Sequence, residues 1–223
     1  MNSRAQILRL GLLVLVVGVV SATAGRLLAY PEPALAPVSW ELDFKYEDPQ
    51  LIRVRLPGED QPRLYAYMSY TVTNDTGEEQ LFFPEVTVYT DQGDLFMANR
   101  QIPVAVFDRI KERERNRLLE SPYQVVGKLL QGEDHARDSV IVWPIHNKDV
   151  NLVKLFISGL SGETQSTPHP RTGEQLLLRK TLMLEFRTPG DLSHNPEKPF
   201  ILEDSQRSEE RGVGKECATG CRS

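Results

Sequence analysis

Cysteine is almost absent from this chain of 223 residues: only Cys217 and Cys221 are present, and both lie near the C-terminus. Everything before them therefore lacks a thiol for a disulfide, for a zinc site or for a lipid attached to a cysteine near position 24. The spacing Cys-x-x-x-Cys has no histidine close by, so it is weak support for a metal or redox site. We expect no metal and no cofactor.

The chain also lacks an uninterrupted apolar run of the roughly 20 residues that cross a bilayer as a helix. It has a shorter run, Leu10 to Val20, which follows Arg4 and Arg9 and leads into Ala22-Thr23-Ala24. A basic start, an apolar run and a small-residue triplet are the three parts of an export signal. We therefore predict an exported protein of the periplasm or cell envelope. Residues 1–24 are either a cleaved signal peptide or an N-terminal transmembrane anchor.

The C-terminal end does not share the patterns of the rest of the chain. Arg207 to Cys217 closely resembles the translation of a common DNA-sequencing adapter. Within it, Gly212-Val-Gly-Lys215 lacks the glycine at position 209 that a phosphate-binding loop needs. We interpret residues 207–223 as a non-native tail. The predicted organisation is a leader (1–24), a proline-rich spacer (25–37), a β-sandwich (38–190) with a helical insertion (103–130), an irregular segment (191–206) and this tail (207–223).

Positive charge is scarce in the predicted domain. The whole chain carries a formal net charge of −5. Arg4 and Arg9 give the leader +2, and four basic against three acidic residues give the tail +1, so residues 25–206 carry −8. Such a balance argues against nucleic acid or anionic lipid as a partner. Contact with a membrane is expected only through the N-terminal segment, if it is not cleaved.

Most of the predicted domain alternates between apolar and polar residues, which is typical of half-buried strands. The clearest case is Leu64 to Thr73, which stops at the turn-forming sequence Asn74-Asp-Thr-Gly77. Gln80 to Thr90 returns, with Pro84 marking a sheet edge or a bulge. About eight strands are expected within 40–46, 52–56, 64–73, 80–90, 95–97, 139–143, 150–158 and 175–187.

The period changes after Pro103. Val106, Phe107, Ile110 and Leu118 fall near one helical face, and charged residues cover the others. A helix of about four turns, begun by Pro103 and ended before Pro122, would dock through the first three of these apolar residues. Residues 123–130 are compatible with a second short helix.

Many short alternating strands separated by turns predict two packed antiparallel sheets. The segments Tyr67-Met-Ser-Tyr-Thr-Val-Thr-Asn-Asp-Thr-Gly77 and Leu155-Phe-Ile-Ser-Gly-Leu160 resemble exported bacterial immunoglobulin-like domains of uncharacterised function. The resemblance spans residues 38–188. It implies an immunoglobulin-like β-sandwich with one helical insertion, and it implies fold more than activity.

Catalytic motifs are lacking. Ser158-Gly-Leu-Ser-Gly162 would need glycine at 163 to form a nucleophile elbow, and Glu163 stands there. No histidine pair has metal-ligand spacing, so we interpret the four histidines, His135, His146, His169 and His194, as solvated loop residues. Adjacent carboxylates in turns do not face each other across a cleft. No catalytic, cofactor-binding or metal-binding residue is therefore predicted, and a hydrolase with a site assembled from distant loops is kept as the alternative.

The candidate partner-binding residues are Tyr65, Tyr67, Arg113 and Arg115. If Leu64, Met68 and Tyr70 face the core, the two tyrosines face outward, to bind a glycan or an envelope protein, or lie under the insertion. The arginines belong to a helix of nearly balanced charge, which is also typical of a solvated face. Asn74-Asp-Thr76 fits a glycosylation sequon, but turn chemistry explains it better. The sequence favours a non-enzymatic interaction or envelope-structural role.

Overall fold

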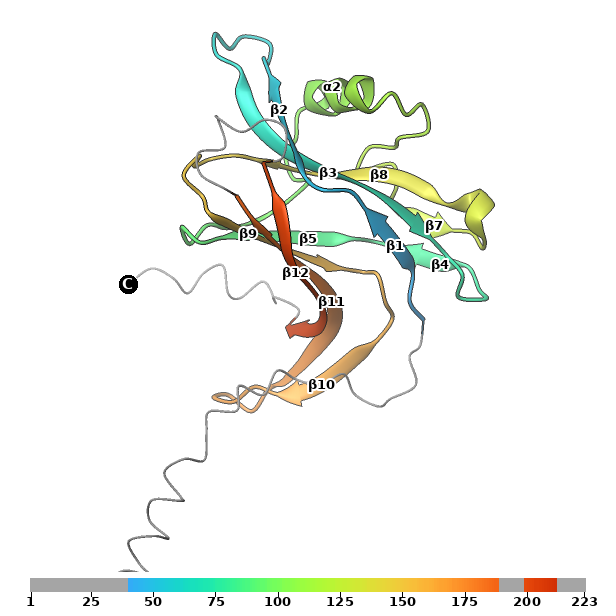
Figure 1. Ribbon diagram of the computed structural model, residues 1–223. Coiled ribbons are helices and arrows are strands. Elements are labelled where there is room, and N and C mark those ends of the chain that lie inside the picture. The colour runs from blue at the N-terminus through green and yellow to red at the C-terminus, as the bar shows by residue number, and fades with distance from the viewer. Residues whose placement is uncertain (1–39, 189–198, 212–223) are drawn as a thin grey trace, which may run out of the picture. The chain divides into compact units, whose positions relative to one another are not determined.

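Two antiparallel sheets pack face to face, as the alternating pattern predicted (Figure 1). The computed structural model describes residues 40–188 and 199–211, with residues 207–211 described by their backbone. The elements are β1 (Asp43–Tyr46), β2 (Gln50–Val54), β3 (Arg63–Thr73), β4 (Gln80–Phe82), β5 (Glu85–Thr90), β6 (Leu95–Met97), α2 (Val104–Glu114), β7 (Gly127–Leu129), the short 3-10 helix η1 (Glu133–His135), β8 (Arg137–Pro144), β9 (Leu152–Ser158), β10 (Thr164–Pro168), β11 (Gln175–Arg187) and β12 (Ile201–Arg211).

The first sheet is organised around β3. One edge of β3 pairs with β8 along most of its length. The other edge pairs with β1 near its C-terminal end and with β2 near its N-terminal end, so β1 and β2 follow each other along the same edge. A single long strand thereby fixes the register of three partners.

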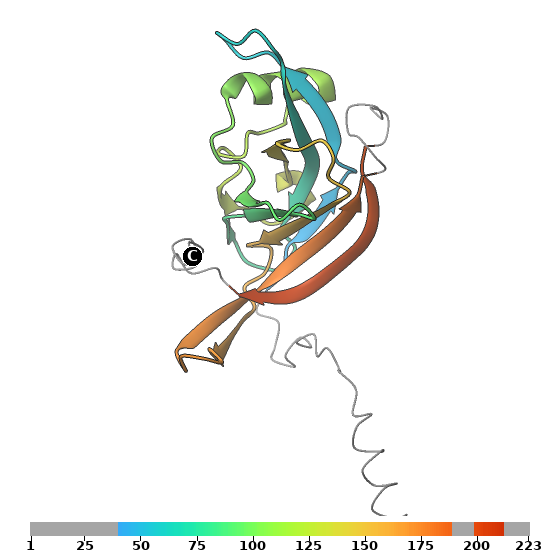
Figure 2. The same cartoon turned by 90° about the vertical axis from the view of Figure 1, so that its left-hand side faces the viewer.

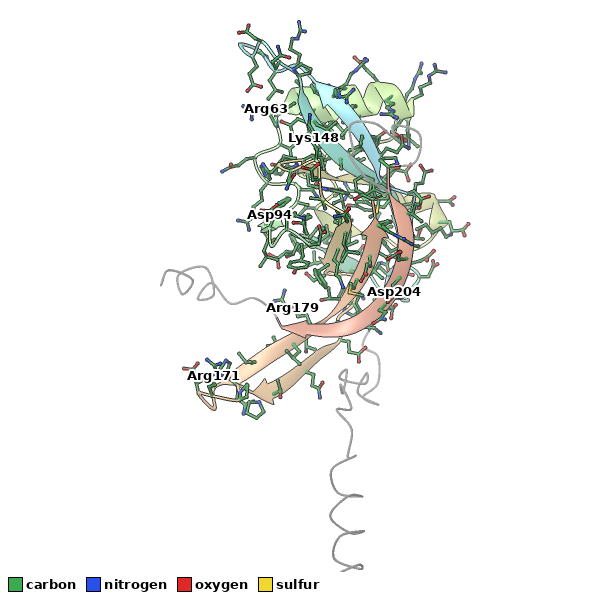
Figure 3. The ribbon with its side chains drawn as sticks, turned by 60° about the vertical axis from the view of Figure 1, so that its left-hand side comes forward. Arg63, Asp94, Lys148, Arg171, Arg179 and Asp204 are labelled. Carbon is green, nitrogen blue, oxygen red and sulfur yellow. The ribbon has the colours of Figure 1, made fainter. Side chains whose placement is uncertain are left out.

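The second sheet has the order β12-β11-β9-β5-β6. The C-terminal half of β11 pairs with β9 and its N-terminal half with β10, while β12 lies along the opposite edge. The β10–β11 hairpin extends away from the packed sheets, and Figure 3 shows Arg171 at its far end. A separate two-stranded ribbon pairs β4 with β7.

The main core lies between the two sheets (Figure 2). Side chains that point inward from β3 and β8 meet side chains from β5, β9 and β11. Its largest fully buried members are Trp143, Phe82, Phe186, Phe200, Leu42, Met68, Leu129, Ile141, Leu155 and Ile157. The predicted mainly-β sandwich is confirmed.

Helix α2 adds a third layer on the outer face of the first sheet. Val106 and Ile110 are fully buried against a second cluster that includes Val140 and Val142 of β8. The helix begins after Pro103, as predicted, but it ends earlier, where Arg115 adopts the left-handed conformation with φ 55°. The predicted continuation of this helix toward Pro122 is therefore wrong.

Two residues of the predicted helical insertion lie differently from expectation. Phe107 is half-buried rather than fully buried. Leu118 is 79% exposed, because the chain leaves the helix before it, and Leu119 packs inward instead. Within 123–130 the structure has strand β7 in place of a second helix.

The C-terminal segment also differs from the prediction. Residues 191–206 were expected to be irregular, yet Ile201 begins a strand that pairs with β11 and continues through the backbone of residues 207–211. The leader, the spacer and the two cysteines lie outside the described residues. Within the described ranges, no helix is both long and apolar enough to span a membrane.

Replacing Phe107 with alanine is expected to lower the free energy of unfolding by about 1.5 kcal/mol. The loss is smaller than for a fully buried phenylalanine, because a half-buried ring removes less apolar surface from water. The matched change Leu118→Ala should cost less than about 0.5 kcal/mol, because that side chain is exposed. Urea unfolding monitored by circular dichroism measures both. Equal costs would contradict the described packing of α2.

Candidate functional site

The two candidate tyrosines lie beneath α2 rather than on the surface. Tyr65 and Tyr67 are both buried in the cluster that docks the helix. The Tyr67 hydroxyl donates a hydrogen bond of 2.6 Å to Glu114 Oε1. Burial, with this hydrogen bond, raises the pKa of Tyr67, so the phenol stays neutral. Of the two predicted alternatives, the structure has the one in which the tyrosines lie under the insertion, so their rings are not available to a partner on the surface.

The two candidate arginines lie at the C-terminal end of α2 and are exposed. Arg113 lies over the Tyr67 ring at 5.9 Å from its centroid and donates a 2.6 Å hydrogen bond to the carbonyl oxygen of Leu51. Arg113 therefore helps to hold the helix on β2. Arg115 closes the helix through its backbone N–H, which donates to the Lys111 carbonyl at 3.1 Å. Its exposed side chain forms no hydrogen bond or ion pair with the residues that the structure describes.

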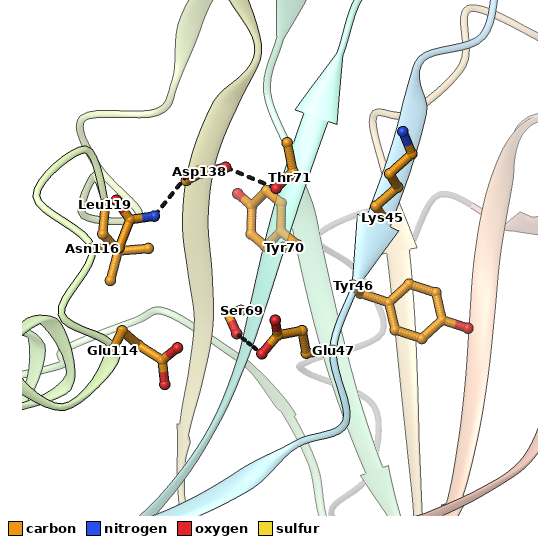
Figure 4. Close-up of a pocket in the computed structure, with 10 residues that line it drawn as sticks. All are labelled: Lys45, Tyr46, Glu47, Ser69, Tyr70, Thr71, Glu114, Asn116, Leu119 and Asp138. Atoms are coloured by element: carbon orange, nitrogen blue, oxygen red, sulfur yellow. Dashed lines mark hydrogen bonds between the residues drawn. The ribbon is translucent and has the colours of Figure 1, made fainter. Parts of the chain in front are cut away.

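A polar cleft of about 290 Å³ lies between β1, β3, β8 and the end of α2 (Figure 4). Asp138 in this cleft accepts hydrogen bonds of 2.7 Å from Thr71 Oγ1 and from Asn116 Nδ2. Ser69 donates to Glu47 at 3.2 Å. These polar groups are bonded to one another, and the serine is paired with a carboxylate rather than with a histidine. The cleft does not resemble the activated nucleophiles of hydrolases.

The histidines that the structure describes are dispersed. His146 packs edge-on against Phe96 with ring centroids 5.5 Å apart. His169 accepts two backbone hydrogen bonds in the β10–β11 turn, and His135 is exposed in η1. His194 lies outside the described residues. Across the described ranges, no three His, Cys, Asp or Glu side chains are grouped so as to hold a metal ion.

The other sequence motifs have structural roles. Ser161 Oγ donates a 3.0 Å hydrogen bond to the Trp40 carbonyl, which joins the turn after β9 to the segment before β1. The amide nitrogen of Asn74 donates 2.8 Å bonds to the carbonyl oxygens of Glu78 and Leu129, and the side chain is fully buried. Turn chemistry thus accounts for the sequon, as expected.

The β4–β7 ribbon carries the surface feature that sequence reasoning missed. Leu81 lies opposite Lys128, and continuing this register by one residue beyond each strand places Phe83 near Val126 and Glu79 near Leu130. These residues share the outer face of the ribbon because directly opposite residues point to the same side. Four apolar members of this face are exposed: Leu81 by 58%, Phe83 by 55%, Val126 by 38% and Leu130 by 41%. We call these four residues the ribbon face.

The inner side of the ribbon is fixed to the main core. Phe82, Val125 and Leu129 alternate with the ribbon-face residues and are almost fully buried. Lys128 Nζ pairs with Glu79 Oε2 at 2.9 Å across the two strands. The buried residues therefore hold the ribbon on the core, while the ribbon-face side chains are exposed to solvent. No period-two signal marks this strand, because Val125-Val126 and Leu129-Leu130 are adjacent apolar pairs that also fit a helix.

Gly159 supports the ribbon from behind. Its φ is +86°, and a Cβ atom there would lie 2.5 Å from the Phe83 carbonyl oxygen and 3.3 Å from Pro84 Cα. The backbone of Phe83 and Pro84, just after β4, thus approaches the turn after β9 more closely than a residue with a Cβ atom permits.

Replacing Gly159 with alanine is expected to destabilise the domain by about 2 kcal/mol, from the positive φ and the backbone contact together. Thermal unfolding measures the effect. Gly173→Ala is the matched control, because it has a φ of +74° without a close neighbour. The two variants should differ, and equal losses would show that the close approach to Phe83 does not exist.

Comparison with known proteins gives no relative to compare with this arrangement. No family model, no curated protein and no solved structure matches the chain.

Proposed function

We propose that this chain is an exported, non-enzymatic interaction domain of the periplasm or cell envelope, which binds a partner protein through the ribbon face. The export signal in residues 1–24 supports the compartment. The immunoglobulin-like resemblance supports a sandwich used as a binding scaffold, although this finer relationship stays a prediction.

One observation carries the proposal: four large apolar side chains project from a single ordered ribbon. Isolated exposed apolar residues are ordinary on protein surfaces, but a contiguous set on one face is typical of interaction sites. Lys128 and Glu79 on the same face supply polar contacts among the apolar ones. That composition suits a protein partner better than a glycan, because three of the four side chains are aliphatic and Phe83 is the one aromatic ring among them.

The hydrolase alternative receives less support. Its site would have to gather a nucleophile and a base from separate loops, as hydrolytic sites do. In the 290 Å³ cleft, Asp138 accepts hydrogen bonds from Thr71 and Asn116, and Glu47 accepts one from Ser69. These hydrogen bonds do not form the nucleophile–base pair that a hydrolase needs.

Site-specific photo-crosslinking tests the ribbon face. We expect a photoreactive phenylalanine at position 81 to give a discrete covalent adduct in the cells that naturally produce this protein. The matched position is Leu177 of β11, which is 52% exposed and lies on the β10–β11 hairpin. No adduct from position 81, or identical adducts from both positions, would contradict the proposal.

N-terminal sequencing tests the export part. Cleavage after Ala24 should leave Gly25 as the first residue of the protein recovered from an envelope fraction. Recovery of intact Met1 from membranes would favour the anchored form, and intact Met1 from the cytoplasm would overturn export.

A further inference from the structure

The ribbon face belongs to a longer strip of exposed apolar side chains. Residues 115–126 run along the outer edge of β8: Glu120 N donates to the Asp138 carbonyl at 2.9 Å, and Arg137 donates to the carbonyls of Gln124 and Val125 at 2.7 and 3.0 Å. Leu118 is 79% and Tyr123 65% exposed in this segment, which leads directly into β7. We call Leu118, Tyr123 and the ribbon face together the edge strip.

The beginning of the edge strip is basic. Arg115 and Arg117 are exposed on either side of Asn116, and neither forms an ion pair with any described residue. Asn116 orders this segment, because its Oδ1 accepts from Leu118 N at 2.9 Å and its Nδ2 donates to Asp138 at 2.7 Å. Two cations and an exposed leucine are therefore presented in a fixed conformation.

The other end of the edge strip is acidic. Asp75, Glu78 and Glu79 lie in the turn before β4, and Glu133 and Asp134 lie in η1, all exposed. The two loops are side by side, since Gly132 N donates to the Asn74 carbonyl at 2.9 Å and Gly77 N donates to Gln131 Oε1 at 3.2 Å. Lys128 is the one cation on the ribbon, and it is already paired with Glu79.

We propose that the edge strip binds the edge strip of a second copy of this chain, in an antiparallel dimer with two-fold symmetry. In such a dimer Arg115 and Arg117 of each copy face the carboxylates around Glu78 of the other, while the apolar side chains meet in the middle. A two-fold interface must be self-complementary, and a strip with opposite charges at its two ends meets that requirement. The inference rests on the proposed function, because the ribbon face forms half of the strip.

Charge reversal at each end tests the antiparallel arrangement. One variant carries Arg115→Glu and Arg117→Glu, and the other carries Asp75→Lys, Glu78→Lys, Glu133→Lys and Asp134→Lys, which leaves Glu79 with its partner Lys128. We expect the unmodified protein to be a dimer at micromolar concentration in sedimentation velocity. Each variant alone should dissociate about tenfold or more readily, because like charges then face each other at both ends.

An equimolar mixture of the two variants should restore a dimer. The reversed end of one variant then faces the reversed end of the other, the two unchanged ends face each other, and the charges are opposite at both contacts. Arg171→Glu is the control, because Arg171 lies at the tip of the β10–β11 hairpin (Figure 3) and should leave the dimer unchanged. Far-ultraviolet circular dichroism checks that each variant is folded. A monomer at all concentrations, or a mixture that stays dissociated, would overturn the dimer. A monomer that still gives an adduct from position 81 would overturn the dimer but retain the proposed function.

Discussion

Replacing Asn74 with alanine is expected to lower the free energy of unfolding by about 4 kcal/mol, because several buried polar groups lose their partners at once. The Asn74 amide nitrogen donates to two carbonyl oxygens, those of Glu78 and Leu129. Its Oδ1 accepts from Thr76 N, Thr76 Oγ1 and Gln131 Nε2 at 3.1, 2.8 and 2.9 Å. The side chain thus joins the turn before β4 to the end of β7.

Thermal unfolding provides the measurement, with an expected fall in midpoint of about 10 °C for a domain of this size. Asp75→Ala is the control, since the neighbouring side chain is exposed and should change the midpoint little. If Asn74→Ala unfolds within about 1 °C of the unmodified protein, the buried network is not formed as described.

Replacing Lys180 with methionine is expected to cost about 3 kcal/mol, because it leaves a buried carboxylate without its cation. Lys180 Nζ lies 3.0 Å from Glu41 Oε2 and 3.2 Å from Glu163 Oε2. The Glu163 side chain is only 7% exposed, whereas Glu41 is 27% exposed. The cluster joins β11 to the turn after β9 and to the segment before β1.

The double variant Lys180→Met with Glu163→Met should recover most of the lost stability, because neither buried charge remains. Denaturant unfolding of the two single variants and the double variant completes the cycle. Additive losses would show that Lys180 and Glu163 do not interact, and would contradict the described ion pair.

The period-two pattern predicted the sandwich well because most strands have one face in the main core. It placed strands at β3, β8, β9 and β11 and a helix start at Pro103, all confirmed. It did not decide whether Tyr65 and Tyr67 face outward or lie under the insertion, because the rule that one face is buried and the other solvated fails for a sheet covered on both sides. That second covering depends on where α2 docks, which no local pattern encodes.

The remaining differences involve short or composition-biased segments. Strand β7 has only three residues, and its apolar positions also fit a helix. The charged residues of β12 obscured its alternation, although charge is a common protection of an edge strand. The ribbon face could not be identified because its exposure follows from the pairing of β4 with β7, which are far apart in the chain.

The separation of the two apolar clusters divides the domain into parts of unequal local stability. The buried apolar residues of helix α2, Val106 and Ile110, belong to the second cluster, which shares no buried residue with the core between the sheets. The helix can therefore open without disrupting the sandwich, and amide protons of α2 should exchange with solvent faster than those of β3 or β11. Each opening would expose Tyr65, Tyr67 and the outer side of β8. The domain would then have a transient apolar surface in addition to the ribbon face, which is always exposed.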